Sequence, residues 1–207
     1  MSYIFHHPGE IAWRLAQHVE LTFAALALAC AIAFPLGVLV ARRRRAGGAI
    51  LGVLGAIYTI PSLALFALLI PVFGIGYLTA LVALVAYAQM ILVRNVATGL
   101  RSVPPALREA ARGLGLSSWQ SLWRVELPHA LPVIVGGIRI ATVSLIAIAN
   151  LAAWIDAGGM GTLLFAGMQR DEPDKIVAGS VVTAALAIAA DLALRAAERA
   201  ARRSFAR

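Results

Sequence analysis

Two long stretches without charged residues restrict most strongly how this chain can fold. Residues 21–41 form the first stretch and residues 46–93 form the second. Because about 20 consecutive apolar residues suffice to cross the hydrocarbon core of a bilayer, the first stretch predicts one membrane span and the second predicts two. A surface helix of a soluble domain would need a polar face, and these stretches have none. They therefore predict a membrane protein and exclude a soluble globular domain.

The composition and the remaining apolar runs extend this prediction to the whole chain. Of its residues, 61% are hydrophobic and 14% are charged, whereas soluble domains have roughly 25% charged residues. The runs do not alternate apolar and polar residues as strands of a membrane barrel do, so an all-α membrane protein is expected. No repeat or linker divides the chain, and residues 1–207 are taken as one transmembrane domain. Five spans are predicted, at residues 19–41, 48–70, 77–98, 131–154 and 176–195.

Basic residues gather on one side of the predicted spans. If the N-terminus is outside, fourteen of the 18 lysines and arginines lie in inner segments or at inner span ends, three lie outside, and Arg139 lies within the fourth span. Inner segments are enriched in lysine and arginine, so an outside N-terminus and a cytoplasmic C-terminus are predicted. The net charge of +8 is therefore an orientation signal, and no nucleic-acid partner is predicted. The inner set includes the arginines at 42–45 and, in the C-terminal tail, Arg202, Arg203 and Arg207.

The inner loop between the third and fourth spans, roughly residues 99–130, is predicted to form two short helices. Pro105 suits the first position of a helix, where its missing N–H is not needed. Gly115 suits the turn that follows. Ser117 with Gln120 three residues later predicts a capping box at the start of the second helix. On this spacing alone, an amphipathic loop lying on the membrane surface is an equally good interpretation.

A longer pattern in this loop resembles the EAA signature of ABC-importer permeases. That signature reads Glu-Ala-Ala, three residues, Gly, nine residues, Ile, one residue, Leu-Pro; here valine replaces isoleucine and every spacing agrees. The resemblance implies the type I ABC-importer permease fold, with the loop docked into a groove on a separate ATP-binding subunit. It predicts ATPase-coupling roles for Glu109, Ala110, Ala111, Gly115, Val125, Leu127 and Pro128.

The same resemblance implies the partners of the chain. These are a dimer of ATPase subunits carrying ATP and Mg²⁺, a second permease subunit that is the same or a related chain, and a soluble or lipid-anchored substrate-binding protein. The chain itself has no phosphate-binding GxxxxGK[ST] loop and no histidines at metal-ligand spacing, so neither a cofactor nor a metal is predicted on it. A multi-pass transport subunit in the lipid of the bacterial inner membrane is expected, not an enzyme.

Three further stretches, residues 18–45, 58–76 and 125–169, resemble permeases for the osmoprotectants glycine betaine, carnitine and choline. The resemblance implies a quaternary amine as the substrate. Methionine or another amino acid or small amine is the alternative, because methionine-type permeases share the fold and the EAA loop. A quaternary ammonium group binds aromatic faces, which Tyr58, Tyr87 and Trp154 could supply; anchoring at the membrane interface is the other interpretation of these aromatics.

Helix-breaking and polar residues at membrane depth complete the predicted translocation pathway. Pro61 is expected to bend the second span and free a carbonyl that must be satisfied within the protein. Asn95 and Asn150 can contact substrate or form interhelical hydrogen bonds, and Arg139 and Asp191 can pair or reach the interface. The predicted pathway residues are Tyr58, Pro61, Tyr87, Asn95, Asn150 and Trp154.

The segment after the fourth span is rich in glycine and opens with an aspartate. It predicts a short re-entrant or interfacial element on the outer side of the membrane. In the family that the chain resembles, this region forms the outer gate and faces the binding protein. The predicted gate residues are Asp156, Gly158, Gly159 and Gly161.

Overall fold

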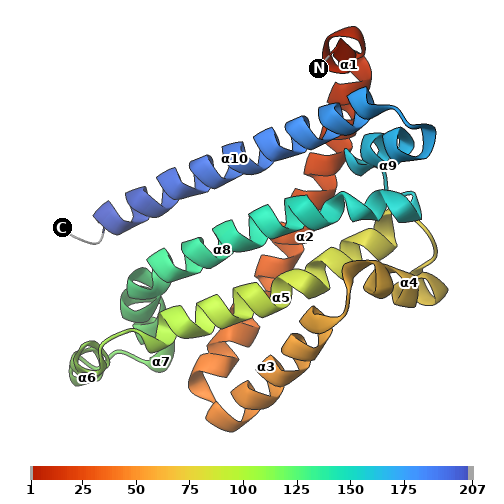
Figure 1. Ribbon diagram of the computed structural model, residues 1–207. Coiled ribbons are helices and arrows are strands. Elements are labelled where there is room, and N and C mark those ends of the chain that lie inside the picture. The colour runs from red at the N-terminus through yellow and green to blue at the C-terminus, as the bar shows by residue number, and fades with distance from the viewer. Residues whose placement is uncertain (1, 205–207) are drawn as a thin grey trace.

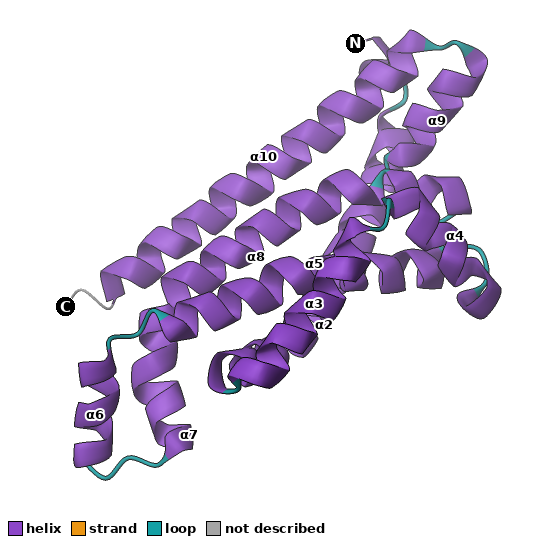
Figure 2. Ribbon diagram, turned by 60° about the horizontal axis from the view of Figure 1, so that its bottom comes forward, coloured by secondary structure: helices purple, strands orange, loops and turns teal. Residues whose placement is uncertain are grey.

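A computed structural model describes the backbone of residues 2–204 and the side chains of residues 3–199; the side chains of Arg202, Arg203 and Arg207, counted above toward orientation, lie outside this part. The described chain is helical and contains no strand (Figures 1 and 2). Its helices are α1 (Ser2–His6), α2 (Pro8–Arg42), α3 (Arg44–Thr59), α4 (Ser62–Phe73), α5 (Tyr77–Arg101), α6 (Pro105–Gly113), α7 (Ser118–Ser121), α8 (Leu127–Ala149), α9 (Gly161–Arg170) and α10 (Pro173–Ser204).

Four helical stretches are long and apolar enough to cross a membrane: α2, α5, α10 and the stretch Ser118–Ala149 that ends with α8. They contain all of the first, third and fifth predicted spans and most of the fourth. The end predicted for the fourth span is wrong, since α8 stops at Ala149 and a 3₁₀ turn, Leu151–Ile155, follows. The Asn150 side chain donates to the carbonyls of Ile146 and Ala147, and such bonds compete with continuation of the helix.

The second predicted span, residues 48–70, is not one helix. α3 ends at Thr59, α4 begins at Ser62, and their axes differ by 101°. The break lies at Ile60, whose extended backbone (φ −66°, ψ 129°) is the conformation favoured before proline. The bend at Pro61 is confirmed, and it is sharp enough to divide the span into two helices.

The bundle has two distinct ends (Figure 1). α1, α4 and α9 lie at the end where the chain begins, and α6, α7 and the α2–α3 hairpin lie toward the other end, where α10 finishes. The chain passes between these ends an odd number of times if α3 and α4 together count as one passage. This arrangement agrees with the five spans predicted from the sequence.

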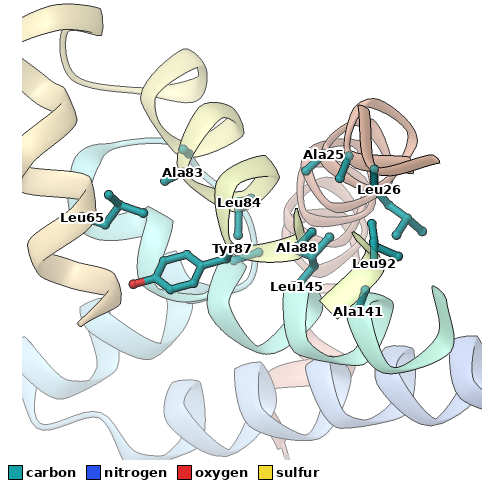
Figure 3. Close-up of a cluster of buried hydrophobic side chains, with 14 of the residues drawn as sticks. Ala25, Leu26, Leu65, Ala83, Leu84, Tyr87, Ala88, Leu92, Ala141 and Leu145 are labelled. Atoms are coloured by element: carbon teal, nitrogen blue, oxygen red, sulfur yellow. The ribbon is translucent and has the colours of Figure 1, made fainter. Parts of the chain in front are cut away.

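Helix α5 forms the centre of the bundle, packed between α2 and α8. Figure 3 shows its Ala83, Leu84 and Ala88 among buried side chains of α2, α4 and α8. Glycines let the backbones approach closely: a Cβ on Gly37 of α2 would lie 2.5 Å from the Val96 Cβ, and one on Gly137 of α8 would lie 2.4 Å from the Cβ of Asn95. The three helices therefore interlock at fixed positions.

Candidate functional site

The loop between α5 and α8 has the local structure that the sequence predicts. α6 starts at Pro105 and ends at Gly113. Gly115 has φ +75°, a left-handed conformation that favours glycine at the end of a helix. The capping box of α7 is present: the Gln120 N–H donates to Ser117 Oγ at 3.3 Å, and the Ser117 N–H donates to Gln120 Oε1 at 2.9 Å. Both short helices and the turn between them are confirmed.

The EAA residues divide between an exposed tip and a partly buried base. Glu109 and Ala110 are exposed on α6, and Ala111 is buried beneath them. Gly115 is exposed in the turn. The base of the loop consists of half-buried residues from the π-helical turn Leu122–Glu126 and the first turn of α8, namely Val125, Leu127 and Pro128.

A buried carboxylate that the sequence analysis passed over holds the two halves of the loop together. Glu126 occupies the spacer position of the EAA pattern, and only 3% of its surface is exposed. Its Oε1 accepts hydrogen bonds from Arg42 Nη2 at 2.9 Å and from Ser121 Oγ at 3.2 Å. Its Oε2 lies 3.4 Å from Arg108 Nε, within ion-pair range but without a hydrogen bond. Glu126 thereby ties the end of α2 to α6 and to the base of the loop.

A sequence signal for this residue exists. Between Arg94 and Asp156 the chain has only two acidic residues, Glu109 and Glu126, among many arginines. An isolated carboxylate in a basic loop is a candidate for an ion-pair centre, because an unpaired buried charge would be costly. The EAA pattern does not specify the residue at this position, so the resemblance to the pattern does not point to Glu126.

The break in the second span brings three predicted pathway residues together. The Tyr87 hydroxyl on α5 donates to the carbonyl of Ile60, immediately before Pro61. Tyr58 packs edge-on against Tyr87 with ring centroids 6.0 Å apart, and 44% of its surface is exposed. The missing N–H of Pro61 frees the carbonyl of Ile57, which accepts from the Ile60 N–H at 3.2 Å. Both carbonyls at the break are therefore satisfied within the protein, as predicted.

The other three predicted pathway residues lie elsewhere. Asn95 donates to the carbonyl of Ile91 in its own helix. Asn150 accepts from Thr183 Oγ1 at 3.3 Å, which links the end of α8 to α10. Trp154 is largely exposed and packs edge-on against Phe165. The structure thus brings Tyr58, Pro61 and Tyr87 together, whereas Asn95, Asn150 and Trp154 interact with Ile91, Thr183 and Phe165.

The charges predicted at membrane depth in α8 and α10 form a cluster. Arg139 donates to Glu198 Oε2 at 2.8 Å and lies 3.0 Å from Asp191 Oδ1. Asp191 also pairs with Arg195 at 2.7 Å. Charges within a membrane protein usually pair in this way and face protein or water. Of the two alternatives predicted for Arg139 and Asp191, pairing or reaching the membrane interface, the structure shows pairing.

The glycine-rich segment after α8 folds closely against the first half of α2. Asp156, Gly158 and Gly159 all have positive φ, which requires glycine or a short polar residue. A Cβ on Gly159 would lie 3.1 Å from His18 Nδ1, and one on Gly161 would lie 1.9 Å from the Asn150 carbonyl oxygen. Backbone and side chain are so close here that larger residues would clash.

His18 anchors this segment and is a second residue that sequence reasoning missed. It is fully buried. Its Nδ1 accepts from the Met160 N–H at 3.3 Å, and its Nε2 lies 3.0 Å from the carbonyl oxygen of Ile146. An imidazole that accepts at Nδ1 carries its proton on Nε2, so His18 donates to Ile146. No local pattern around His18 predicts this role, because its partners lie 128 and 142 residues away in the sequence.

A small cluster joins α1 to the start of α10 at the same end of the bundle. Tyr3 donates to Glu10 Oε2 at 2.7 Å, and Lys175 lies over the Tyr3 ring. Burial and the bond to Glu10 raise the pKa of Tyr3 to about 12. The hydrogen bond from Lys175 lowers the pKa of Glu172. Any stabilisation from the raised pKa of Tyr3 is lost only at strongly alkaline pH, and that from the lowered pKa of Glu172 only at acidic pH, so neither group changes charge near neutrality.

Comparisons with known proteins agree on the kind of protein to which these features belong. The family model described as "Binding-protein-dependent transport system inner membrane component" matches residues 33–203. The "Osmoprotectant import permease protein OsmW" of Salmonella typhimurium is 44% identical over 196 residues, 92% of this chain and 91% of OsmW. The "Glycine betaine/carnitine/choline transport system permease protein OpuCB" of Bacillus subtilis is 36% identical over 199 residues, 96% of this chain and 92% of OpuCB.

A solved structure supports the architecture. An inward-facing structure of the MetNI methionine ABC transporter matches with a TM-score of 0.84, covering 94% of this chain and 97% of that one. The two sequences are 22% identical. At this identity the likeness concerns the fold.

Proposed function

Because this chain belongs to the family of binding-protein-dependent transport system inner membrane components, we propose that it is a permease subunit of an ATP-driven importer for osmoprotectant quaternary amines. The chain is a multi-pass inner-membrane transport component and not the ATPase. The observation that carries the substrate class is the 36–44% identity, over nearly the whole chain, to permeases named for osmoprotectants, glycine betaine, carnitine and choline.

Methionine transport, the alternative, has weaker support. The similarity to the methionine transporter is 22% in sequence and lies in the fold. A quaternary ammonium group has no hydrogen to donate and binds aromatic faces. The edge-on pair Tyr58 and Tyr87, beside the break at Pro61, offers such faces at the one place where the predicted pathway residues meet. Asn95, Asn150 and Trp154 are proposed as more distant parts of the pathway.

The EAA loop is the proposed site of coupling to the ATPase. The exposed Glu109 offers a carboxylate, and the small Ala110 permits close approach of a groove on a partner. Ala111 packs α6 onto the rest of the loop, Gly115 makes the turn, and the base at Val125, Leu127 and Pro128 passes movement of α6 into α8. ATP and Mg²⁺ are proposed to act on the partner subunits only.

The orientation and the other partners follow as proposals from the two ends of the bundle. The end that carries α6, α7 and the arginines at 42–45 is proposed to face the cytoplasm, and the end with α1 and α9 to face outward. There, Asp156, Gly158, Gly159 and Gly161 would form the outer gate toward a substrate-binding protein. A second permease subunit, the same or a related chain, would complete the pathway.

Uptake of labelled glycine betaine and choline tests the function. Cells lacking the gene should lose uptake at high osmolarity. The intact gene should restore it, and a gene carrying Glu109→Lys should not. The matched variant Glu10→Lys changes an exposed glutamate in the first turn of α2, outside the EAA loop, and should leave coupling intact. Unchanged uptake of both compounds after deletion would reject the substrate class; restoration by Glu109→Lys would reject the coupling role.

A further inference from the structure

An open cavity of about 660 Å³ lies where the α2–α3 hairpin meets the end of α5 and the start of α6. It is close to the coupling loop but takes no part in the transport role proposed above. Three arginines, two glycines and two apolar residues line it, namely Arg44, Arg101, Arg108, Gly47, Gly48, Ala41 and Leu51.

The fold fixes two of these arginines by hydrogen bonds to carbonyl groups near helix ends. Arg101, the last residue of α5, donates from Nη2 to the carbonyl of Val40 at 2.5 Å. Arg108 on α6 donates to the carbonyl of Leu100. A guanidinium has five N–H donors, so each of these side chains keeps donors that are not used by these bonds.

The glycine in the hairpin makes the cavity possible. A Cβ on Gly47 would lie 2.8 Å from the Val40 carbonyl oxygen, so only glycine lets α3 return this close to α2. The neighbouring Gly48 has no atom within 4 Å of the position where its Cβ would stand. At Gly48 no side chain fills the space beside the helix.

The positive charge around the cavity exceeds the negative charge near it. The Glu126 carboxylate already pairs with Arg42 at 2.9 Å and, at the longer distance of 3.4 Å, with Arg108. In the described part of the chain, no carboxylate pairs with Arg44 or Arg101. The Nε of Arg108 is buried without a hydrogen bond. Two guanidinium groups without a paired carboxylate, beside a third that shares Glu126 with Arg42, favour an anion from outside the chain.

The start of α3 adds to this preference. Its N-cap, Arg43, makes no side-chain cap, so the first N–H groups of a sixteen-residue helix receive no side-chain partner there. Helix N-termini carry partial positive charge that attracts anions. The uncapped end and the three guanidinium groups stand around the same space.

We propose that this cavity binds a phosphate group, supplied by the headgroup of an anionic phospholipid or by free phosphate. Planar guanidinium groups match pairs of phosphate oxygens and hold them by charge-assisted hydrogen bonds. The cavity lies where the apolar stretches of α2 and α5 give way to arginine, the level at which lipid headgroups meet a membrane protein. Because Arg108 also contacts Glu126, an occupied site bears directly on the coupling loop.

Binding to the purified full-length chain in detergent tests the proposal. The probes are dihexanoyl phosphatidylglycerol, dihexanoyl phosphatidylcholine and inorganic phosphate, each titrated at low salt. Arg44→Gln should weaken binding of phosphatidylglycerol about fivefold, as expected for one arginine beside an anionic lipid. The matched variant Arg45→Gln, which removes the same charge outside the cavity, should change it less than about twofold.

A second pair of variants tests the cavity without changing charge. Gly48→Phe places a ring in the open space above α3 and should abolish binding, while Gly52→Phe, one turn further along the helix and equally unobstructed, should not. Phosphatidylglycerol binding well above that of phosphatidylcholine and phosphate identifies a lipid headgroup. Equal binding of phosphate with the same dependence on Arg44 identifies free phosphate. Equal losses in Arg44→Gln and Arg45→Gln, no effect of Gly48→Phe, or no binding by the unmodified chain would each overturn the proposal.

Discussion

Replacing Glu126 by glutamine should destabilise the chain while leaving the shape of the side chain almost unchanged. The substitution removes the negative charge that faces Arg42 at 2.9 Å and Arg108 at 3.4 Å. Breaking a buried ion pair by removing one partner costs about 3–5 kcal/mol. Here the arginine side chains are 41% and 31% exposed, and water screens charges that it reaches. A loss of about 1–3 kcal/mol is therefore expected.

Thermal unfolding of the purified chain in detergent measures this loss. For domains of 150–250 residues, 1 kcal/mol corresponds to roughly 2–4 °C, so Glu126→Gln should lower the midpoint by several degrees at a fixed scan rate. The matched control is Glu109→Gln, the other glutamate of the loop. It is exposed and should change stability by no more than about 0.5 kcal/mol.

A double variant separates the ion pair from general damage. If Glu126 stabilises the chain through Arg42, then Arg42→Gln should cost less in a chain that already carries Glu126→Gln, by about 0.5–3 kcal/mol. In the assembled importer, Glu126→Gln should also raise the amount of ATP hydrolysed per substrate transported, because α6 would no longer be tied to α2. An unchanged midpoint, or strictly additive losses in the double variant, would refute the assignment of Glu126 as the centre of the loop.

Three further predictions have defined outcomes, and the second of them includes a matched control. Tyr87→Phe leaves the carbonyl of the broken span without its donor and should cost about 1–3 kcal/mol of stability in thermal unfolding; an unchanged midpoint would mean that another donor takes its place. Gly137→Ala puts a methyl group 2.4 Å from the Asn95 Cβ and should be strongly destabilising. Its control, Gly136→Ala, meets nothing within 4 Å and should gain up to about 1 kcal/mol in helix stability. Similar unfolding midpoints for the two variants would contradict the close approach of α5 and α8. Gly115→Ala meets no atom but forces a side chain into a left-handed turn, so it should lower the free energy of unfolding by about 1 kcal/mol. It should also reduce co-purification of the ATPase. Normal recovery of the ATPase would show that the turn is not needed for docking.

The sequence predicts the helical spans well because apolar length and the placement of arginine are local properties. The four unbroken spans fall on the long apolar runs of the sequence. The capping box at Ser117 and the bend at Pro61 were also predictable, since each depends on residues within a few positions. The angle of the bend was not, because α4 packs against α5, a contact that lies outside the local sequence.

The site residues show the same division between local and distant interactions. Gly115 was predictable from its place after a short helix. The partners of Glu126 and His18 were not predictable because they are distant in the sequence: Arg42 is 84 residues from Glu126, and Ile146 is 128 residues from His18. One sequence can mark an isolated carboxylate as a candidate ion-pair centre, but it does not give the arginine that the carboxylate meets. The separation of Asn95 from Tyr87 has the same origin, since both lie on α5 and only the neighbouring helices decide which of them meets the break.

The hydrogen bond between Tyr87 and the Ile60 carbonyl also constrains the order in which the chain enters the membrane. The donor lies 27 residues after the acceptor, so during synthesis α3 and α4 emerge before α5 can satisfy the break. An unpaired carbonyl in hydrocarbon costs several kcal/mol. We therefore expect the two broken helices to remain in a polar or protein-lined environment until α5 has been made, and the second and third passages to enter the lipid together as one insertion unit.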